Sequence, residues 1–207
     1  MNSSIFVAGT GTEVGKTWVL TQVITELRGR GHEIRARKPA QSFAPTALGT
    51  TDAELIGAAS DELATVVCPA HRWYETPMAP PMAAAVLGRP PFTIADLVRE
   101  IGVPPHCFIE GAGGPRSPIA ADGDNVDLAR ALAVGLVILV ADAGLGTINA
   151  VELSVAAFHG FEVIVLVNRL DRTSDLHLRN REWLTEAGHR IETDINTLAD
   201  CLVPRFS

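Results

Sequence analysis

Cysteine is scarce in this chain and occurs only three times in 207 residues, as Cys68, Cys107 and Cys201. The three positions are far apart and odd in number, which excludes a disulfide framework and the closely spaced cysteine pair of a zinc site. Free, widely spaced cysteines are typical of proteins from a reducing compartment. We therefore expect a cytoplasmic protein.

Long apolar runs and an excess of basic residues are also lacking. Apolar runs such as residues 134–140 fall far short of the roughly 20 residues needed to cross a bilayer. The first residues do not show the basic and then apolar pattern of a signal peptide. Lysine and arginine total 17 against 24 acidic residues, a net charge of −7, and no basic stripe is present. These absences argue against a membrane or a nucleic acid as a partner.

The residues that are present describe a globular protein. The composition is 47% hydrophobic and 20% charged, which is enough apolar material to bury a core. The length is close to the roughly 150 residues of one domain, so we expect a single domain over residues 1–207. Short apolar runs alternate with longer amphipathic ones, which predicts an α/β fold with a mostly parallel central sheet flanked by helices.

Individual elements follow from this alternation. The expected strands are residues 5–8, 34–37, 107–109, 136–141 and 163–167. The last two are apolar throughout, as in the interior of a sheet. The expected helices are residues 17–28, 52–60, 82–87, 94–101, 126–133, 147–158 and 175–187, with Thr93 as an N-cap. Residues 38–51 are expected to be a loop. Arg35 and Arg37 alternate with apolar residues, so we expect them to form salt bridges on one exposed strand face.

The strongest local signal is GTGTEVGKT at residues 9–17, between the first strand and the first helix. Glycines let backbone N–H groups surround an anion, and the following helix offers the positive end of its dipole. In this pattern Lys16 reaches the β- and γ-phosphates and the Thr17 hydroxyl binds Mg²⁺. Thr10 replaces the usual first glycine, but the strand–loop–helix context still predicts a triphosphate site of the P-loop NTPase type. The alternative is a glycine-rich turn with a surface lysine.

Acidic residues at strand and loop ends are candidates to share the metal. Glu110 closes a strand directly before the glycine-rich residues 111–114, at the strand end where α/β sheets bind ligands. A solvated strand-end carboxylate is the alternative there. Asp52 is weaker, because it fits an N-cap equally well. For Asp142 we favour a structural role, since Glu110 already has the glycine context. The six histidines show no metal-binding spacing.

Several segments, taken in chain order, resemble the dethiobiotin synthetase family. They are GTGTEVGKT at 9–17, KPAQS at 38–42, Asp52, PMAPPMAAA at 77–85, EGAGG at 110–114 and GLGTIN at 144–149. The resemblance implies a cyclo-ligase that uses ATP and Mg²⁺. One amine of diaminopelargonic acid takes up CO₂, the carbamate is phosphorylated, and the second amine closes the cyclic urea. The implied products are dethiobiotin, ADP and phosphate.

The resemblance also implies residue roles. Lys16, Lys38 and Thr12 are the implied catalytic residues, with Lys38 between the carbamate and the γ-phosphate. Thr12 and Ser42 hydrogen-bond the carbamate or the amine. The implied Mg²⁺ ligands are Thr17, Asp52 and Glu110. The implied nucleotide-binding residues are Gly11, Thr12, Glu13, Val14, Gly15, Lys16, Thr17, Glu110, Gly113 and Asn168, the last as a contact to the base.

A homodimer is implied as well. In the family the GLGTIN segment binds the carboxylate tail of the diamine from the neighbouring subunit, which makes Gly146, Thr147 and Asn149 candidate substrate contacts. The chain departs from the family pattern at Gly11, Ala150, residues 115–118 and residues 192–195. The same chemistry on a different diamine or amino acid is therefore a second hypothesis.

A non-ligase ATPase switch of the partition-ATPase type is a third hypothesis. Those ATPases carry a lysine early in the phosphate loop, where this chain has Gly11. The missing lysine and the acidic net charge both count against this hypothesis.

Overall fold

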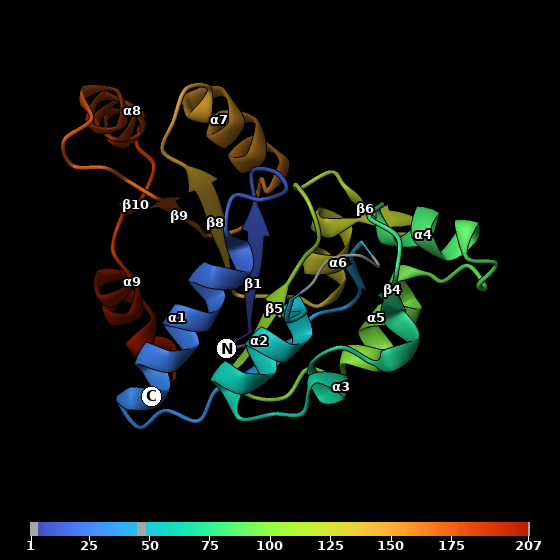
Figure 1. Cartoon of the computed structure of the whole chain (residues 1–207). Coiled ribbons are helices and arrows are strands. Elements are labelled where there is room, and N and C mark those ends of the chain that lie inside the picture. Colours follow the sequence, from blue (N-terminus) through green and yellow to red (C-terminus); the bar gives the residue numbers. More distant parts are fainter. Residues whose placement is uncertain (1–3, 45–48, 207) are drawn as a thin grey trace.

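A six-stranded parallel sheet runs through the computed structural model, which describes residues 4–44 and 49–206 (Figure 1). The strand order is β10-β9-β8-β1-β5-β2. These strands are β1 (Ile5–Gly9), β2 (Arg35–Arg37), β5 (Cys107–Glu110), β8 (Leu136–Asp142), β9 (Val163–Asn168) and β10 (Ile191–Glu192). Neighbouring strands are parallel, so the chain returns across the faces of the sheet between them, mostly as helices. This arrangement confirms the predicted fold class.

Helices cover both faces of the sheet. They are α1 (Lys16–Gly29), α2 (Asp52–Ser60), α3 (Ala64–Val67), α4 (Pro80–Val86), α5 (Ile94–Ile101), α6 (Asn125–Ala131), α7 (Thr147–Ala157), α8 (Asp175–Glu186) and α9 (Ile195–Leu202). In Figure 1, α1, α2 and α9 lie in front of the sheet. No helix in the described ranges is both long enough and apolar enough to span a membrane.

Side-chain alternation along the strands divides the interior into two cores. Ile5 and Val7 of β1 pack in a core with residues of α1, α2 and α9. Phe6 and Ala8 of the same strand pack in a core with residues of α4, α5, α6 and α7. Successive side chains of a strand point to opposite faces, so each central strand must be apolar at every position. This is why β8 and β9 were recognisable from the sequence as interior strands.

Local capping signals set several helix starts. Thr93 caps α5 in a capping box with Asp96, which confirms the predicted N-cap. Thr51 caps α2 in a capping box with Glu54, so Asp52 is the first helical residue and not the cap. Helix α4 begins at Pro80, two residues before the predicted start, because proline is well tolerated in the first helical turn.

Short elements are where the sequence-based prediction was wrong. The predicted loop at 38–51 contains β3 (Gln41–Ser42), which pairs in parallel with β4 (Trp73–Tyr74); its residues 45–48 lie outside the described residues. A hairpin of β6 (Pro118–Ala120) and β7 (Gly123–Asp124), strand β10 and helices α3 and α9 were also not predicted. Two-residue strands carry no periodicity and exist only because a partner strand lies beside them.

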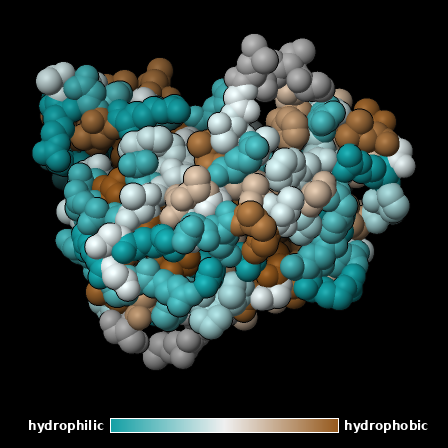
Figure 2. Space-filling view, turned by 60° about the horizontal axis from the view of Figure 1, so that its bottom comes forward, coloured by the Kyte–Doolittle hydropathy of each residue, from teal (hydrophilic) through white to brown (hydrophobic). Residues whose placement is uncertain are grey.

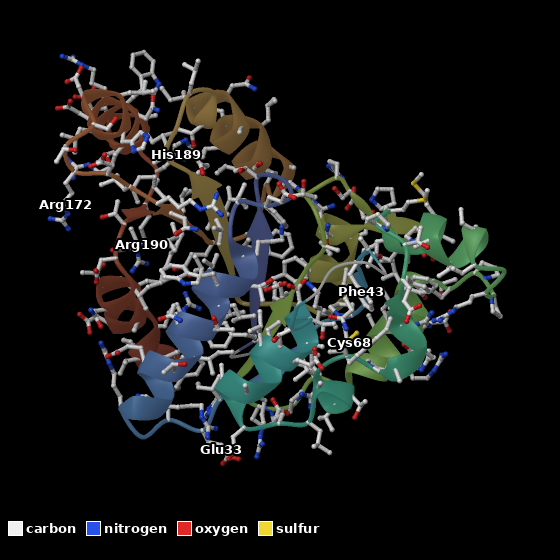
Figure 3. All side chains as sticks on the ribbon, in the orientation of Figure 1. Glu33, Phe43, Cys68, Arg172, His189 and Arg190 are labelled. Carbon is white, nitrogen blue, oxygen red and sulfur yellow. The ribbon has the colours of Figure 1, made fainter. Side chains whose placement is uncertain are left out.

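One face of the molecule is mainly polar (Figure 2), and Cys68 and Cys107 are buried. On the face shown in Figure 2 hydrophilic residues predominate and apolar groups form separate patches. Figure 3 shows Cys68 within the molecule, whereas Glu33 and Arg172 lie at its edges. Burial raises the pKa of the Cys68 and Cys107 thiols to about 12, so both stay protonated at neutral pH. Buried, protonated thiols react slowly.

The predicted salt bridges at the sheet edge are confirmed. Arg35 pairs with Glu33, and Arg37 pairs with the nearly buried Glu62 at 2.8 Å. Glu62 also accepts the backbone N–H of Ala36 at 2.8 Å. Arg37 is therefore engaged in holding the edge strand.

Phe206 provides a test of the packing at the end of the fold. Its ring lies 5.9 Å from that of Phe108 in β5, and only 6% of the residue is exposed. We expect Phe206→Ala to lower the free energy of unfolding by about 3 kcal/mol, measured by urea denaturation, because it leaves a cavity in this core. The control Leu63→Ala, at a residue 73% exposed, is expected to change it by less than about 0.5 kcal/mol. Equal effects of the two substitutions would contradict the packing.

Candidate active site

The glycine-rich loop lies at the carboxyl end of β1 and leads directly into α1. The Thr10 N–H donates to the Val140 carbonyl of β8 at 2.9 Å, which ties the loop to the centre of the sheet. Gly15 has a φ of 93°, and a Cβ atom there would lie 2.3 Å from Nδ2 of Asn168, so only glycine fits. The Lys16 ammonium donates to the Gly11 carbonyl at 2.9 Å. The lysine is thus held across the loop that precedes it.

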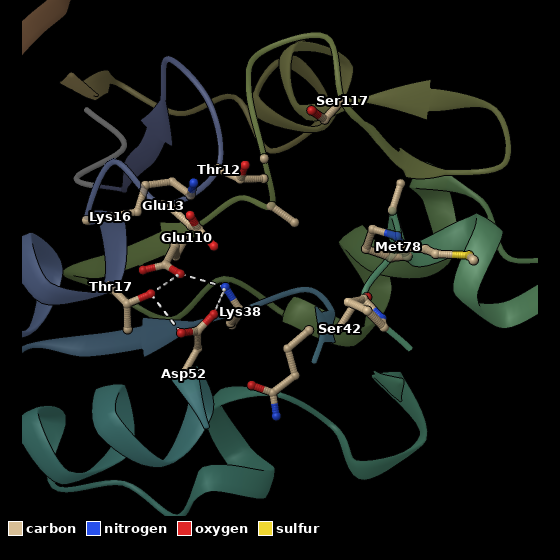
Figure 4. A pocket seen from close by; sticks show the side chains of 17 residues that line it. Thr12, Glu13, Lys16, Thr17, Lys38, Ser42, Asp52, Met78, Glu110 and Ser117 are labelled. Atoms are coloured by element: carbon tan, nitrogen blue, oxygen red, sulfur yellow. Dashed lines mark hydrogen bonds and ion pairs between the residues drawn. The ribbon is translucent and has the colours of Figure 1, made fainter. Parts of the chain in front are cut away.

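Four elements bring a lysine, two carboxylates and a hydroxyl together beside this loop (Figure 4). Lys38 directly follows β2, and its ammonium lies 2.6 Å from Oε1 of Glu110 and 2.9 Å from Oδ2 of Asp52. Glu110 ends β5 and is fully buried. The Thr17 hydroxyl of α1 lies 2.9 Å from Oε1 of Glu110 and 3.0 Å from Oδ1 of Asp52. Parallel strands that end at one edge explain why residues so distant in sequence meet here.

Charges in the cluster stabilise one another. Burial alone lowers the pKa of Lys38, but the charges of Glu110 and Asp52 outweigh burial and hold the pKa above its ordinary value. The Lys38 charge in turn holds the pKa of Asp52 below its usual range. Burial lowers the pKa of Lys16, and the Glu110 charge opposes that change. At neutral pH Lys38 is therefore a cation and Asp52 an anion.

The oxygen atoms of this cluster suit a hard divalent cation. Oε2 of Glu110 is buried and has no hydrogen-bond partner among the described residues. The Thr17 hydroxyl and the Asp52 carboxylate lie next to Glu110 and are also oxygen ligands. Mg²⁺ is commonly held by one or two carboxylates together with substrate phosphates. In the described ranges no three His, Cys, Asp or Glu side chains gather as a metal cluster. The fit to Mg²⁺ rests on two carboxylates and one hydroxyl.

A cavity of about 640 Å³ opens over the cluster and the loop. This volume lies within the range found for small-molecule binding sites. The lining residues come from the charged cluster, the phosphate loop, residues 41–42 and 77–80, and the glycine-rich loop after β5. They are Thr12, Glu13, Gly15, Lys16, Thr17, Lys38, Gln41, Ser42, Asp52, Pro77, Met78, Ala79, Pro80, Glu110, Ala112, Gly113 and Ser117. Oγ of Ser42 and Nε2 of Gln41 are buried without a hydrogen-bond partner in the described part of the chain.

Asn125 holds the second glycine-rich loop, residues 111–114 after β5, in place. The sequence analysis did not identify this residue. The side chain is buried, and its Oδ1 accepts the Ala112 N–H at 3.2 Å. Its Nδ2 lies 2.7 Å from the Ala112 carbonyl, 2.8 Å from that of Gly114 and 3.3 Å from that of Ser117. These partners are backbone groups, which every residue carries whatever its side chain. No sequence pattern therefore indicates this role of Asn125.

Other predicted site residues lie outside this cavity. Gly146, Thr147 and Asn149 begin α7 and do not line it. The Thr147 hydroxyl donates to the Asp142 carbonyl, and Asn149 is exposed. Nδ2 of Asn168 donates to the Val14 carbonyl at 2.9 Å. The Asp142 carboxylate accepts the Gly144 N–H at 2.9 Å and pairs with Arg169 at 3.3 Å, which agrees with the structural role that we favoured.

The fold and the loop define a P-loop nucleotide-binding protein. The chain matches the family model of an AAA domain over residues 3–191. The septum site-determining protein of Pyrococcus horikoshii, complexed with Mg-ADP, superposes with a TM-score of 0.51. That superposition covers 100% of this chain and 87% of that one at 12% identity, which shows a shared fold.

Sequence relatives narrow this class. The ATP-dependent dethiobiotin synthetase BioD of Corynebacterium efficiens is 37% identical over 173 residues, which cover 80% of this chain and 74% of that protein. The BioD protein of Anaeromyxobacter sp. strain Fw109-5 is 36% identical over 83% of this chain and 78% of that protein. The chain belongs to the dethiobiotin synthetase family of ATP-dependent ligases. This confirms the resemblance found in the sequence.

Replacing Asn125 tests how the second loop is held. We expect Asn125→Ala to lower the free energy of unfolding by about 1–3 kcal/mol, because buried backbone groups at residues 112–117 lose their partners. Asn125→Asp keeps the acceptor but loses the N–H donors, and we expect a similar loss. Denaturant unfolding measures both. The exposed Asn196→Ala serves as the control, and an Asn125→Ala protein as stable as this control would contradict the assignment.

Proposed function

We propose that this protein carboxylates a vicinal diamine, diaminopelargonic acid, and closes it to the cyclic urea dethiobiotin, using ATP and Mg²⁺. The observation that carries the proposal is one cavity lined by two lysines, three carboxylates and a phosphate loop, in a chain of the dethiobiotin synthetase family. The same surroundings suit a reaction in which an anionic carbamate must approach the anionic γ-phosphate of ATP. The proposal places the enzyme in the cytoplasm.

The chemistry has three steps. One amine of the diamine attacks CO₂ and loses a proton, which gives a carbamate. A carbamate oxygen then attacks the γ-phosphorus of ATP, so that ADP leaves and a carbamic–phosphoric anhydride forms. The second amine attacks the carbonyl carbon of the anhydride and loses a proton, the ring closes, and phosphate leaves. Positioning and charge neutralisation are the main tasks left to the protein.

The phosphate loop is proposed to hold the triphosphate. Residues from Gly11 to Thr17 direct backbone N–H groups at the phosphates, together with the positive end of α1. Lys16 leaves the Gly11 carbonyl and pairs with the β- and γ-phosphates. When bound by Thr17, Asp52 and Glu110, Mg²⁺ supplies neutralisation of phosphate charge. Gly113 also lines the cavity.

Lys38 is the proposed bridge between the two anionic reactants. Its stem is buried, and its ammonium is held at the cavity by Glu110 and Asp52. A cation at that place reduces the repulsion between the carbamate and the γ-phosphate, and it stabilises charge as the phosphoryl group moves. Thr12 and Ser42 line the same cavity. We assign their hydroxyls to the carbamate or the amine, and the unpaired Oγ of Ser42 supports this assignment.

A homodimer is part of the proposal. The family resemblance implies that the start of α7 binds the carboxylate tail of a substrate held by the partner subunit, and we assign it that role. Gly146, Thr147 and Asn149 do not line the cavity of their own chain, which is compatible with the assignment. Two large apolar residues near the start of α7 are exposed, Leu145 at 91% and Leu153 at 66%. Such exposed leucines are favourable to bury in an interface.

Phosphate release tests the reaction and the role of Lys38. The intact protein is expected to release phosphate from ATP only when diaminopelargonate and bicarbonate are both present. Release that is independent of the diamine would support an ATPase switch, and a different diamine that triggers release would support the second hypothesis. In the same assay, Lys38→Met is expected to lose nearly all turnover, at least about a hundredfold.

Calorimetry separates chemistry from nucleotide binding in this variant. Lys38→Met keeps the phosphate loop, so its ATP affinity is expected to stay within about threefold of the native value. The control Arg35→Met lies in the edge strand that Lys38 follows but is paired with Glu33 at the surface, and it is expected to keep full turnover. Unchanged turnover of Lys38→Met would exclude Lys38 from the reaction, and equal loss of turnover and affinity would make it a nucleotide ligand only.

Mixed dimers test the shared site. Asn149→Ala and Lys38→Met homodimers are each expected to be inactive or very weak. After random exchange at equal mixing, half of the dimers are heterodimers, and one of the two sites in each carries both native groups. About a quarter of full activity is then expected to return. No recovery despite independently demonstrated exchange would place both groups in the site of one chain.

A further inference from the structure

Gln41 connects two segments of the site through a buried hydrogen bond. Its side chain is almost fully buried, and Oε1 accepts the backbone N–H of Ala53 at 3.0 Å. Ala53 is the second residue of α2 and directly follows Asp52. The hydrogen bond therefore runs from the segment that carries Lys38 and Ser42 to the first turn of the helix that carries Asp52.

Backbone hydrogen bonds fix the segment on which Gln41 lies. At its start, the Lys38 N–H donates to the Val67 carbonyl at 2.8 Å. At its end, the Phe43 N–H donates to the Tyr74 carbonyl at 3.0 Å. Between these two points β3 pairs with β4. Because the backbone is held on both sides of Gln41, its side chain extends to α2 from a fixed position.

The start of α2 depends on this side chain because the local cap serves only part of the first turn. The first backbone N–H groups of a helix have no partner within the helix. The Thr51 hydroxyl accepts the N–H of Glu54. The N–H of Ala53, a fully buried residue, is accepted by Gln41. Without that oxygen a buried N–H would lack a partner, which is costly, and the helix start would have to move to find another acceptor.

Two side-chain contacts also hold the Asp52 carboxylate, from Lys38 at 2.9 Å and from Thr17 at 3.0 Å (Figure 4). Under the proposed function both partners turn to ligands, since Lys38 bridges carbamate and γ-phosphate and the Thr17 hydroxyl binds Mg²⁺. The hydrogen bond between Gln41 and Ala53 involves neither of these groups. It can therefore hold the start of α2 while Mg²⁺ and ATP are bound.

We propose that Gln41 is a positioning residue for the Mg²⁺ site, because its Oε1 sets the place of Asp52 through the N–H of Ala53. The inference rests on the proposed binding of Mg²⁺ and ATP. Nε2 of Gln41 has no hydrogen-bond partner among the described residues, so the oxygen is the engaged half of the amide. A side chain that offers only an acceptor at this place is therefore expected to serve as well.

Calorimetry of ATP binding, once with MgCl₂ and once with EDTA, tests this inference. The native protein is expected to bind ATP more tightly with Mg²⁺. Gln41→Met has a similar volume but no acceptor for Ala53, and it is expected to bind Mg–ATP about tenfold more weakly. In EDTA its affinity for ATP is expected to stay within about twofold of the native value, because the phosphate loop is unchanged.

Two further variants of Gln41 separate the acceptor from the rest of the side chain. Gln41→Asn keeps an amide that is one methylene too short to reach Ala53, and it is expected to behave as Gln41→Met does. Gln41→Glu keeps an oxygen at this place and adds a negative charge that a helix N-terminus favours. It is expected to bind Mg–ATP within about threefold of the native value.

Ser60→Ala is the matched control at the other end of α2. It removes another buried hydrogen bond of this helix, from the Ser60 hydroxyl to the Ile56 carbonyl at 3.0 Å. It is expected to bind ATP as the native protein does, both with MgCl₂ and with EDTA.

Native Mg–ATP affinity in Gln41→Met and Gln41→Asn would overturn the inference. Equal weakening with MgCl₂ and with EDTA would also overturn it, because Gln41 would then act on the phosphate loop or the whole fold. So would a Gln41→Glu protein as weak as Gln41→Met. Native protein that binds ATP equally in both solutions would instead overturn the proposed Mg²⁺ site, and native protein that binds no ATP would overturn the nucleotide site, each together with this inference.

Discussion

A buried lysine between two carboxylates is the constraint on which the arrangement of the site depends. Removing Lys38 and Glu110 from water costs several kcal/mol for each ion, and their 2.6 Å contact offsets that cost only while the geometry is kept. The contact joins the ends of β2 and β5, and Asp52 brings the start of α2 to the same point. A hydrophobic cluster of similar volume would stabilise the fold at least as well. The charges are therefore best explained by what the cavity binds.

The loops around this cluster are held by buried asparagines. Asn125 fixes the glycine-rich loop after β5, and Asn168 braces the phosphate loop. Asn180 of α8 donates to the carbonyls of Ala143 and Gly144, each at 3.0 Å, in the loop after β8. Each amide replaces hydrogen bonds that an irregular backbone cannot make with itself. Three loops at one sheet edge are thus preorganised before any ligand arrives, which favours a reaction controlled by positioning.

The sequence by itself determined the fold class, the phosphate loop and the set of charged site residues. Apolar strands and amphipathic helices have a period, and Gly-Lys-Thr between a strand and a helix has a local physical meaning. The tertiary structure decided which residues meet. Thr51 rather than Asp52 is the N-cap of α2, so the Asp52 carboxylate is available to contact Lys38 and Thr17. The role of Asn125 was invisible in the sequence, because its partners are backbone groups brought near only by folding. Strands of two residues, such as β3 and β10, likewise exist only through the strands beside them.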